Sequence, residues 1–418
     1  MATPLLTIAT AGSVDDGKST LIGRLLYETD SLSLDRLAQV ESASRRAGHE
    51  GLDLSLVTDG LLAEREQGIT IDVAHLYFSS SCCDFIIADT PGHFEYTRNM
   101  VTGASRADMM VLLVDSRHGV KEQSLRHLYI AGLLRLRHVI VAVNKMDLID
   151  WSEQRFNNIC AELESHSKQF GFSDMRMHGV PVSSLLGENI TAPSPRMTWF
   201  KGLPLLELLE SCAESWRPEP QPLRFVVQNT IRPRSPEWQD FRGCAGRLYG
   251  GPLRVGDEVL VQPSGMRSRV RDIQYSGNSH EAAAPGSSCT VLLEHDIDVS
   301  RGDLLVRPEE AAPERERVRA TICHFSRRVL QPGQNYLLQV GTLRVPVSVL
   351  SLEACMRPDF SGLDAASQLR MNDIGIACLQ AAEPLCLDSF AHSRHTGSFI
   401  LIDETTLETC AVGLVRDA

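Results

Sequence analysis

The sequence lacks the signals that would place the chain in a membrane or on a nucleic acid. No apolar run approaches the roughly 18 residues that a membrane-spanning helix needs. The chain does not open with a charged region followed by an apolar run, as a secretory leader does. Acidic residues outnumber basic ones by 53 to 41, and the resulting net charge of −12 disfavours nucleic acid as a partner. We therefore expect a cytoplasmic protein with no membrane and no nucleic-acid partner.

The cysteines also lack a pattern. None of the eleven belongs to a C-x-x-C pair, and their spacing shows no His/Cys cluster typical of a metal site. Cys82 and Cys83 are adjacent and cannot form a zinc corner, so we interpret them as incidental. Scattered cysteines of this kind fit a reducing compartment.

A phosphate-binding motif lies near the N-terminus, between a short apolar run at residues 5–9 and a helical pattern at residues 21–26. It matches G-x-x-x-x-G-K-[ST] and comprises Gly12, Ser13, Val14, Asp15, Asp16, Gly17, Lys18 and Ser19, followed by Thr20. Its glycines let backbone N–H groups surround a phosphate. Lys18 is expected to reach the β- and γ-phosphates and Ser19 to bind Mg²⁺. A chance turn carrying Lys-Ser is the alternative, which the following motifs disfavour.

A second motif follows the apolar run at residues 85–88. It consists of Asp89, Thr90, Pro91, Gly92 and His93. The Asp89 carboxylate can hold Mg²⁺ through water, and Gly92 offers an N–H to the γ-phosphate with no Cβ in the way. A D-x-x-G sequence alone is weak evidence. Its place after a buried strand and downstream of the phosphate loop makes the functional interpretation much stronger.

A third motif, after the apolar run at residues 139–143, predicts which base is bound. It consists of Asn144, Lys145, Met146 and Asp147. The Asp147 carboxylate can accept two hydrogen bonds from guanine, whereas adenine lacks both donors, so the site is expected to reject ATP. The alternative is a polar turn after a strand. Ser183, in a small-residue loop after another apolar run, is expected to lie behind the guanine.

The segment between the first two motifs has two interpretations. Thr70 lies in an alternating stretch, residues 69–78, and its β-branched side chain suits a strand. Alternatively, Thr70 is a switch threonine that closes on Mg²⁺ and the γ-phosphate. The uneven polar stretch at residues 28–67 is typical of a segment that orders only with a triphosphate bound.

The 418 residues exceed what one core usually supports, and the pattern changes midway. Residues 1–217 alternate apolar runs with amphipathic helices, which predicts an α/β fold: a doubly wound parallel sheet with ligands at the carboxyl ends of its strands. A proline-dense linker follows. Residues 222–308 and 315–418 carry many short strands with turn signals, which predicts two small β-barrel domains.

Taken together, these residues resemble the translation-factor GTPases. Within that class they are most similar to the GTPase (large) subunit of bacterial sulfate adenylyltransferase, also called ATP sulfurylase. The likeness lies in residues 12–26, 59–72, 89–93, 241–243, 255–257, 263–265, 371–375 and 396–403. Elongation factor Tu usually has His where this chain has Asp16. The chain departs from the family at Ser393 and at residues 410–414, far from the nucleotide motifs.

The resemblance implies an elongation-factor-like fold and a GTPase whose cofactors are GTP and Mg²⁺. It implies catalytic roles for Lys18, Thr70 and His93, with His93 positioning the attacking water beside an apolar gate of Val14 and Ile69. Ser19 and Thr70 would ligate Mg²⁺, and Asp89 would hold it through water.

The same resemblance implies a partner, a smaller catalytic subunit that binds ATP and sulfate and makes adenosine 5′-phosphosulfate and pyrophosphate in sulfate assimilation. The chain would then be one subunit of a heterodimer or of a higher heteromer. The sequence carries no second phosphate-loop motif, which argues against the fused adenylylsulfate kinase of some relatives. The competing hypotheses are an elongation-factor-like GTPase that binds aminoacyl-tRNA and a regulatory GTPase with an unknown partner.

Overall fold

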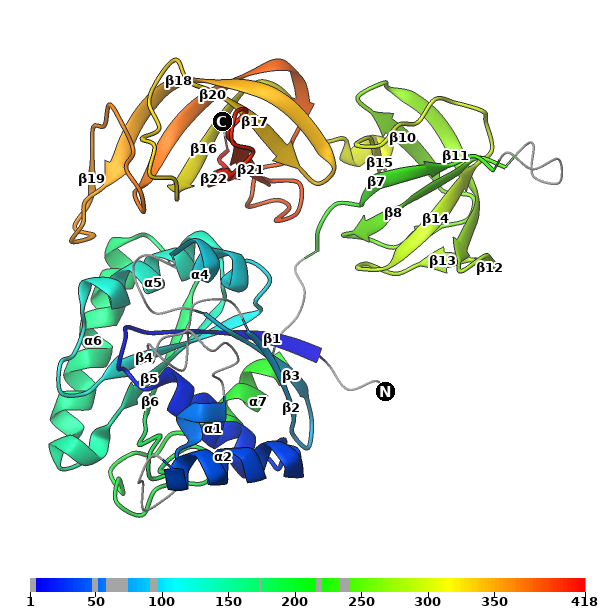
Figure 1. Ribbon diagram of the computed structural model, residues 1–418. Helices are drawn as coiled ribbons and strands as arrows, with labels where there is room; N and C mark the ends of the chain where they lie inside the picture. The colour runs from blue at the N-terminus through cyan, green and yellow to red at the C-terminus, as the bar shows by residue number, and fades with distance from the viewer. Residues whose placement is uncertain are drawn as a thin grey trace. The chain divides into compact units, whose positions relative to one another are not determined.

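The protein is described by a computed structural model, which defines residues 5–46, 52–57, 74–90, 97–172, 174–215, 220–233 and 241–417 (Figure 1). The chain divides into two compact units. The first contains residues 1–217 together with residues 358–362, and the second contains residues 218–357 and 363–418.

The first unit alternates strands and helices, as the sequence predicts. Its elements are β1 (Leu5–Ala11), α1 (Lys18–Glu28), α2 (Leu34–Arg46), η1 (Leu54–Val57), β2 (Ala74–Ser79), β3 (Asp84–Asp89), α4 (Thr97–Ala104), β4 (Met109–Asp115), α5 (Glu122–Leu133), β5 (His138–Asn144), η3 (Met146–Ile149), α6 (Glu153–Gln169), β6 (Arg176–Pro181) and α7 (Leu205–Ser215). The polar stretch at residues 28–67 contains α2 and η1 in its described part, so it is more helical there than its uneven composition suggests.

The strands form one six-stranded sheet in the order β2-β3-β1-β4-β5-β6. All neighbouring pairs are parallel except β2 and β3, which are antiparallel. Every residue of β4 and of β5 is buried, which explains why both read as continuous apolar runs: helices cover both faces of the sheet. Figure 1 shows α4, α5 and α6 on one face and α1, α2 and α7 on the other.

The helices form where the periodicity predicts them. In α6, Ser152 accepts a hydrogen bond from the backbone N–H of Arg155 and caps the N-terminus, and Phe156, Ile159 and Leu163 form the buried stripe. The core beneath α1 and α7 combines side chains of both helices with alternate residues of the strands, among them Ile140 of β5 and Val180 of β6. The predicted doubly wound α/β domain is thereby confirmed.

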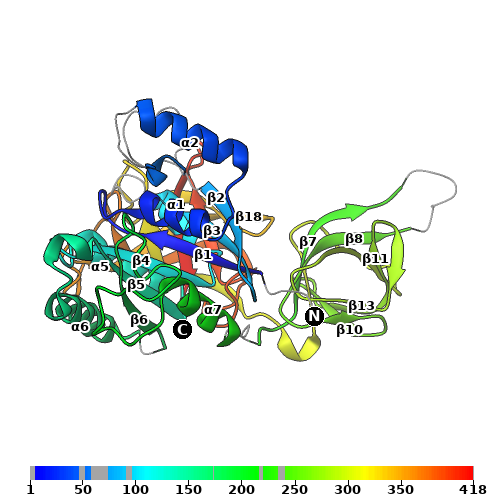
Figure 2. The same cartoon turned by 90° about the horizontal axis from the view of Figure 1, so that it is seen from below.

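The second unit begins with a closed barrel. Its elements are β7 (Arg224–Ile231), β8 (Gly243–Tyr249), β9 (Leu253–Arg254), β10 (Glu258–Gln262), β11 (Met266–Tyr275), β12 (Asn278–His280), β13 (Ala282–Ala283), β14 (Ser288–Leu293), β15 (Leu304–Val306) and η5 (Pro308–Glu310). The order β10-β15-β7-β8-β14-β11 closes because β10 also pairs with β11. Figure 2 shows these strands curving around a common core.

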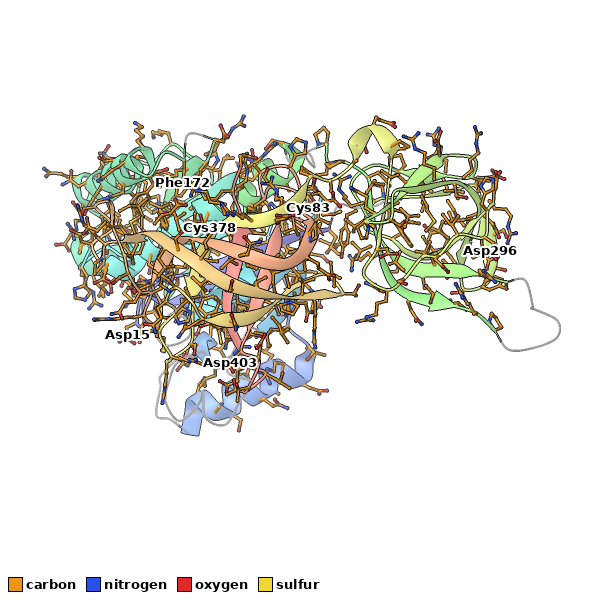
Figure 3. The ribbon with its side chains drawn as sticks, turned by 90° about the horizontal axis from the view of Figure 1, so that it is seen from above. Asp15, Cys83, Phe172, Asp296, Cys378 and Asp403 are labelled. Carbon is orange, nitrogen blue, oxygen red and sulfur yellow. The ribbon has the colours of Figure 1, made fainter. Side chains whose placement is uncertain are left out.

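A second closed barrel follows in the same unit. It is built from β16 (Glu314–His324), β17 (Asn335–Val340), β18 (Leu343–Met356), β19 (Leu363–Asp364), β20 (Ile374–Cys386), β21 (Ser398–Ile402) and β22 (Thr409–Val415). The order β17-β21-β22-β16-β20-β18 closes through the pairing of β17 with β18. Cys378 on β20 and Asp403 after β21 are labelled in Figure 3. Both predicted barrels are thus present.

A buried ion pair lies between these two barrels. The Arg224 guanidinium, on β7, donates two hydrogen bonds of 2.8 Å to the carboxylate of Asp388, which follows β20. Each side chain is only 2% exposed. Burial raises the pKa of Asp388, but the hydrogen bonds from Arg224 and Thr396 and the charge of Arg224 outweigh it, so the pKa lies below its usual range.

Across the described residues, no helix combines the length and apolar character needed to cross a bilayer.

Candidate functional site

Polar residues follow four neighbouring strands of the first unit's sheet, each at the carboxyl end. The phosphate loop follows β1, Asp89 ends β3, Asp115 ends β4 and Asn144 ends β5. Because these four strands are parallel and adjacent, their carboxyl ends meet at one edge. Figure 3 labels Asp15, which lies in the loop after β1.

The phosphate loop is held in its shape by its own side chains. The backbone N–H of Ser13 donates to the Asp16 carboxylate at 2.7 Å, and the N–H of Asp16 donates to the carbonyl of Ser13 at 3.3 Å. Gly17 has a φ of +94°, and a Cβ built on it would lie 2.4 Å from the Asn144 side-chain nitrogen. Only glycine fits this position, because any side chain would be both strained and blocked.

Lys18 is a buried lysine whose positive charge has no partner among the residues that the structure describes. Its side chain begins α1, is 8% exposed and makes no hydrogen bond or ion pair with any described residue. Burial and the charges of Lys18 and Arg126 lower the pKa of neighbouring His127 to about 3, so that ring is neutral at pH 7. An unpaired buried ammonium is costly, and an anion beside it removes that cost. The residues present therefore fit a phosphate group.

The Asn144 side chain forms hydrogen bonds that connect three segments of the site. Its side-chain NH₂ donates to the carbonyl of Asp16 in the phosphate loop at 2.9 Å. Its side-chain carbonyl accepts from both the N–H and the hydroxyl of Ser184, at 3.0 and 2.9 Å. Asn144 is 2% exposed, so these bonds are shielded from water. The phosphate loop, the end of β5 and the loop after β6 are thus fixed in one geometry.

Lys145, which follows Asn144 in the chain, belongs to a network of charged side chains. Lys145 donates to the backbone carbonyl of Asp15 and forms an ion pair of 2.9 Å with Asp115, which also pairs with Arg117 at 2.7 Å. Burial raises the pKa of Asp115, but hydrogen bonds from Arg117 and Lys145 drive it well below its ordinary value. Lys145 therefore connects the base motif, to which it belongs, with the phosphate loop and with the end of β4.

A second lysine, Lys121 at the start of α5, pairs with Asp16 at 3.2 Å. Asp16 is 1% exposed, and burial raises its pKa although Lys121 and the N–H of Ser13 act against this. The Asp16 carboxylate thus has a structural role: it holds the phosphate loop in place through its contacts with Lys121 and with the N–H of Ser13.

Asp147 differs from the other acidic groups of the site. It lies in the short helix η3, is half-buried and makes no hydrogen bond within the described part of the chain. The backbone beside it is fixed, because buried Met146 donates its N–H to the carbonyl of Val182 at 3.2 Å. A rigidly placed carboxylate with free acceptor capacity suits the two adjacent donors of guanine.

The remaining motif residues are only partly described. The Asp89 carboxylate is buried and accepts a hydrogen bond from the hydroxyl of Thr10 at 3.0 Å, and Thr90 donates to the carbonyl of Thr10 at 2.5 Å. Ser19 and Thr20, in the first turn of α1, are half-buried. Five predicted residues of the site and its apolar gate lie outside the described residues: Ile69, Thr70, Pro91, Gly92 and His93.

Sequence reasoning missed Asp115, Arg117, Lys121 and His127. Asp115 ends β4, and Arg117 and Lys121 follow it, so all three could have been noticed as polar residues after the apolar run of that strand. Sequence reasoning also selected Ser183 for the loop after β6. Ser183 is fully buried and bonds within its own loop, whereas Ser184 holds Asn144.

Comparison with known proteins identifies the two ends of the chain. Residues 3–215 match the Elongation factor Tu GTP binding domain family, and residues 317–416 match the GTP-eEF1A C-terminal domain-like family. The first match covers about half of the chain and includes all the motifs of the site. The first unit is therefore a GTP-binding domain.

Curated relatives match along nearly the whole chain. Sulfate adenylyltransferase subunit 1 of Aeromonas hydrophila is 44% identical over 98% of this chain and 86% of that protein. The bifunctional enzyme NodQ of Rhizobium tropici is 44% identical over 99% of this chain and 64% of NodQ. The bifunctional enzyme CysN/CysC of Mycobacterium tuberculosis strain H37Rv is 44% identical over 99% of this chain and 67% of that enzyme. The chain thus spans about two thirds of the length of the two bifunctional relatives.

Among solved structures, the Saccharomyces cerevisiae Ski7 GTPase-like domain, bound to GDP and inorganic phosphate, is similar to this chain with a TM-score of 0.57. The two share 17% sequence identity, and the similarity covers 100% of this chain and 98% of that one. At this identity the likeness supports the three-part fold alone.

Proposed function

Because this chain belongs to the sulfate adenylyltransferase subunit 1 family, within the translation-factor GTPases, we propose that it is the GTP-hydrolysing subunit of a sulfate adenylyltransferase. GTP hydrolysis in the first unit would drive formation of adenosine 5′-phosphosulfate and pyrophosphate from ATP and sulfate on a smaller partner subunit. The observation that carries the proposal is 44% identity to a subunit 1 over 98% of this chain, a span that contains the GTP-site motifs. The complex would be cytoplasmic.

The proposed coupling has a chemical reason. The product contains a mixed phosphate–sulfate anhydride, so its formation is unfavourable in free energy. Hydrolysis of a second nucleotide can drive that reaction. The ATP and sulfate site is assigned to the partner because this sequence has one phosphate-loop motif, which the GTP site uses. The transmitting elements would be the segments around Thr70 and Gly92, whose arrangement depends on the γ-phosphate.

The described residues also support a place for Mg²⁺. Ser19 lies one residue after the phosphate-facing Lys18, and the buried Asp89 carboxylate lies at the neighbouring strand end, so both are suited to a hard cation that prefers oxygen ligands. Thr70 is proposed as the third residue. When bound, Mg²⁺ supplies charge neutralisation at the β- and γ-phosphates. Lys18 binds the same phosphates, and Asn144 keeps the loop that carries it in position.

We propose that His93 positions the attacking water. Replacing it with Ala is expected to lower GTP turnover by about 100-fold or more, because a positioned proton acceptor typically contributes that much, while GTP affinity is unchanged. Single-turnover hydrolysis and equilibrium binding measure the two quantities separately. His118, an exposed histidine near the site, provides the matched control, and His118→Ala should leave both unchanged. An equal loss of turnover and affinity in His93→Ala would instead assign the residue a structural role.

The overall function is tested with the protein purified together with its natural partner. We expect the complex to make adenylylsulfate from ATP and sulfate, and GTP to raise the amount formed, whereas this chain alone makes none. The same preparation is tested for retention of aminoacyl-tRNA. Retained tRNA with no adenylylsulfate would overturn the proposal in favour of an elongation-factor-like role.

A further inference from the structure

A cluster of two histidines and one cysteine lies at the amino edge of the first unit's sheet, the edge opposite the nucleotide motifs. His138 begins β5, His178 lies on β6 and Cys212 lies on α7. One ligand atom from each residue lies within 4.8 Å of those of the other two. Neither the GTP site nor any motif of the sequence uses these residues. Their spacing in the chain has no metal-site pattern, which is why the sequence suggests no His/Cys cluster.

The strand register explains the cluster. Side chains alternate between the faces of a strand, and Ile140 of β5 and Val180 of β6 lie in the same core as α7. His138 and His178 are each two residues from one of these, so both point to that face. Cys212 belongs to the same core and comes from the helix that covers it.

The distances suit a tetrahedral metal ion. The Nδ1 atom of His138 and the Nε2 atom of His178 are 3.3 Å apart. Two nitrogens bound to one Zn²⁺ at about 2.0–2.1 Å are separated by about 3.4 Å, and a nitrogen and a thiolate by about 3.6 Å. The nitrogens therefore already have the required separation, and the sulfur needs to approach by no more than about 1.2 Å.

Burial favours a bound ion over a chance grouping. His138 is 5% and Cys212 3% exposed, and His178 is half-buried. Without a metal, the rings share a single hydrogen bond and the thiol contributes nothing polar to the cluster.

We propose that His138, His178 and Cys212 form a binding site for a zinc-class divalent ion, with the fourth position open to water or a small ligand. Two imidazoles and one thiolate are a ligand set that Zn²⁺ prefers over Mg²⁺. On binding, the Cys212 thiol loses its proton to solvent and the S–metal bond forms, with no change in oxidation state. The ion joins α7 to β5 and β6. The proposal does not depend on the proposed function.

The test is a cobalt titration of the full chain, stripped of metal and kept in excess Mg²⁺ so that magnesium sites are filled. We expect one Co²⁺ per chain with a thiolate-to-cobalt charge-transfer absorption, displaced by one equivalent of Zn²⁺. Cys212→Ala should abolish that absorption and weaken Zn²⁺ binding by at least about 100-fold, since even indirect contacts at metal sites contribute 10- to 100-fold.

Cys160 provides the matched control. It is a partly buried cysteine on α6, and its sulfur packs against the other face of β6 at Gly179. Cys160→Ala should keep the absorption and the affinity. His178→Gln, at the half-buried position, should also weaken Zn²⁺ binding. If Cys212→Ala does not fold, this variant tests the site instead, and unchanged Zn²⁺ affinity would contradict the proposal. Absence of the absorption in the natural protein, or its persistence in Cys212→Ala, would overturn the proposal.

Discussion

Replacing Asp147 with Asn is expected to change the base preference of the protein from guanine to xanthine. In the proposed site the carboxylate would accept two hydrogen bonds from guanine N1–H and N2–H₂, whereas an amide presents one acceptor and one donor. Two hydrogen bonds to a charged group contribute about 3–6 kcal/mol, so GTP affinity should fall by roughly 10²- to 10⁴-fold. Xanthine carries an oxygen in place of the exocyclic amine, and this oxygen accepts from the new NH₂ group.

The measurement is equilibrium binding of GTP and of xanthosine triphosphate to both proteins. Asp150→Asn provides the control, because Asp150 is an exposed carboxylate three positions further along the same segment. It should leave the preference unchanged. If Asp147→Asn still discriminates between the two nucleotides as the natural protein does, the base is recognised elsewhere. This experiment isolates Asp147 because its side chain makes no hydrogen bond within the described residues, so the substitution breaks none of these.

Replacing Asp388 with Ala is expected to destabilise the second unit by about 3–5 kcal/mol. The loss arises because the Arg224 guanidinium remains buried, at 2% exposure, with both oxygen atoms of its carboxylate partner removed. The Thr396 hydroxyl also loses one of its two acceptors, and the Ser393 hydroxyl remains as the other. The change is measured as a lower urea midpoint of the transition that reports on the barrels, at pH 7.

The sign of the pH dependence follows from the lowered pKa of Asp388. A carboxyl group whose pKa is lower in the folded state stabilises that state fully above its unfolded pKa, near 3.9, and loses this contribution as the pH falls through the folded value. The difference between Asp388→Ala and the natural protein should therefore shrink below about pH 4. Glu353→Ala is the control, since Glu353 makes an exposed pair with Arg319 and should cost at most about 1 kcal/mol. If both variants lose the same free energy of unfolding, burial is not what makes the Arg224–Asp388 pair important for stability.

Local patterns predicted the fold and the nucleotide motifs because their information is contained in short stretches. The fully buried strands β4 and β5 are continuous apolar runs, and the phosphate loop is recognisable from its glycines and Lys18. Parallel topology then places the loop and Asn144 at one edge, as expected. These inferences need only periodicity and the rule for ligand sites in α/β sheets.

Pairings between distant residues were not predictable in the same way. Arg224 and Asp388 are 164 positions apart, and His138 and His178 are 40 positions apart. The pairing of Asp16 with Lys121 spans 105 positions. Each pair depends on strand register and helix placement, which a single sequence does not specify. For the same reason, Ser184 rather than Ser183 could be identified as the partner of Asn144 only from the three-dimensional arrangement.

Calorimetric titration of the full chain with GTP, GDP and ATP in the presence of Mg²⁺ tests most directly whether the first unit is a guanine-specific nucleotide site. One equivalent of GTP or GDP should bind with measurable heat, and ATP should produce none at the same concentration. No heat with either guanine nucleotide, or equal binding of ATP, would contradict the assignment of Lys18, Asn144 and Asp147 to that site.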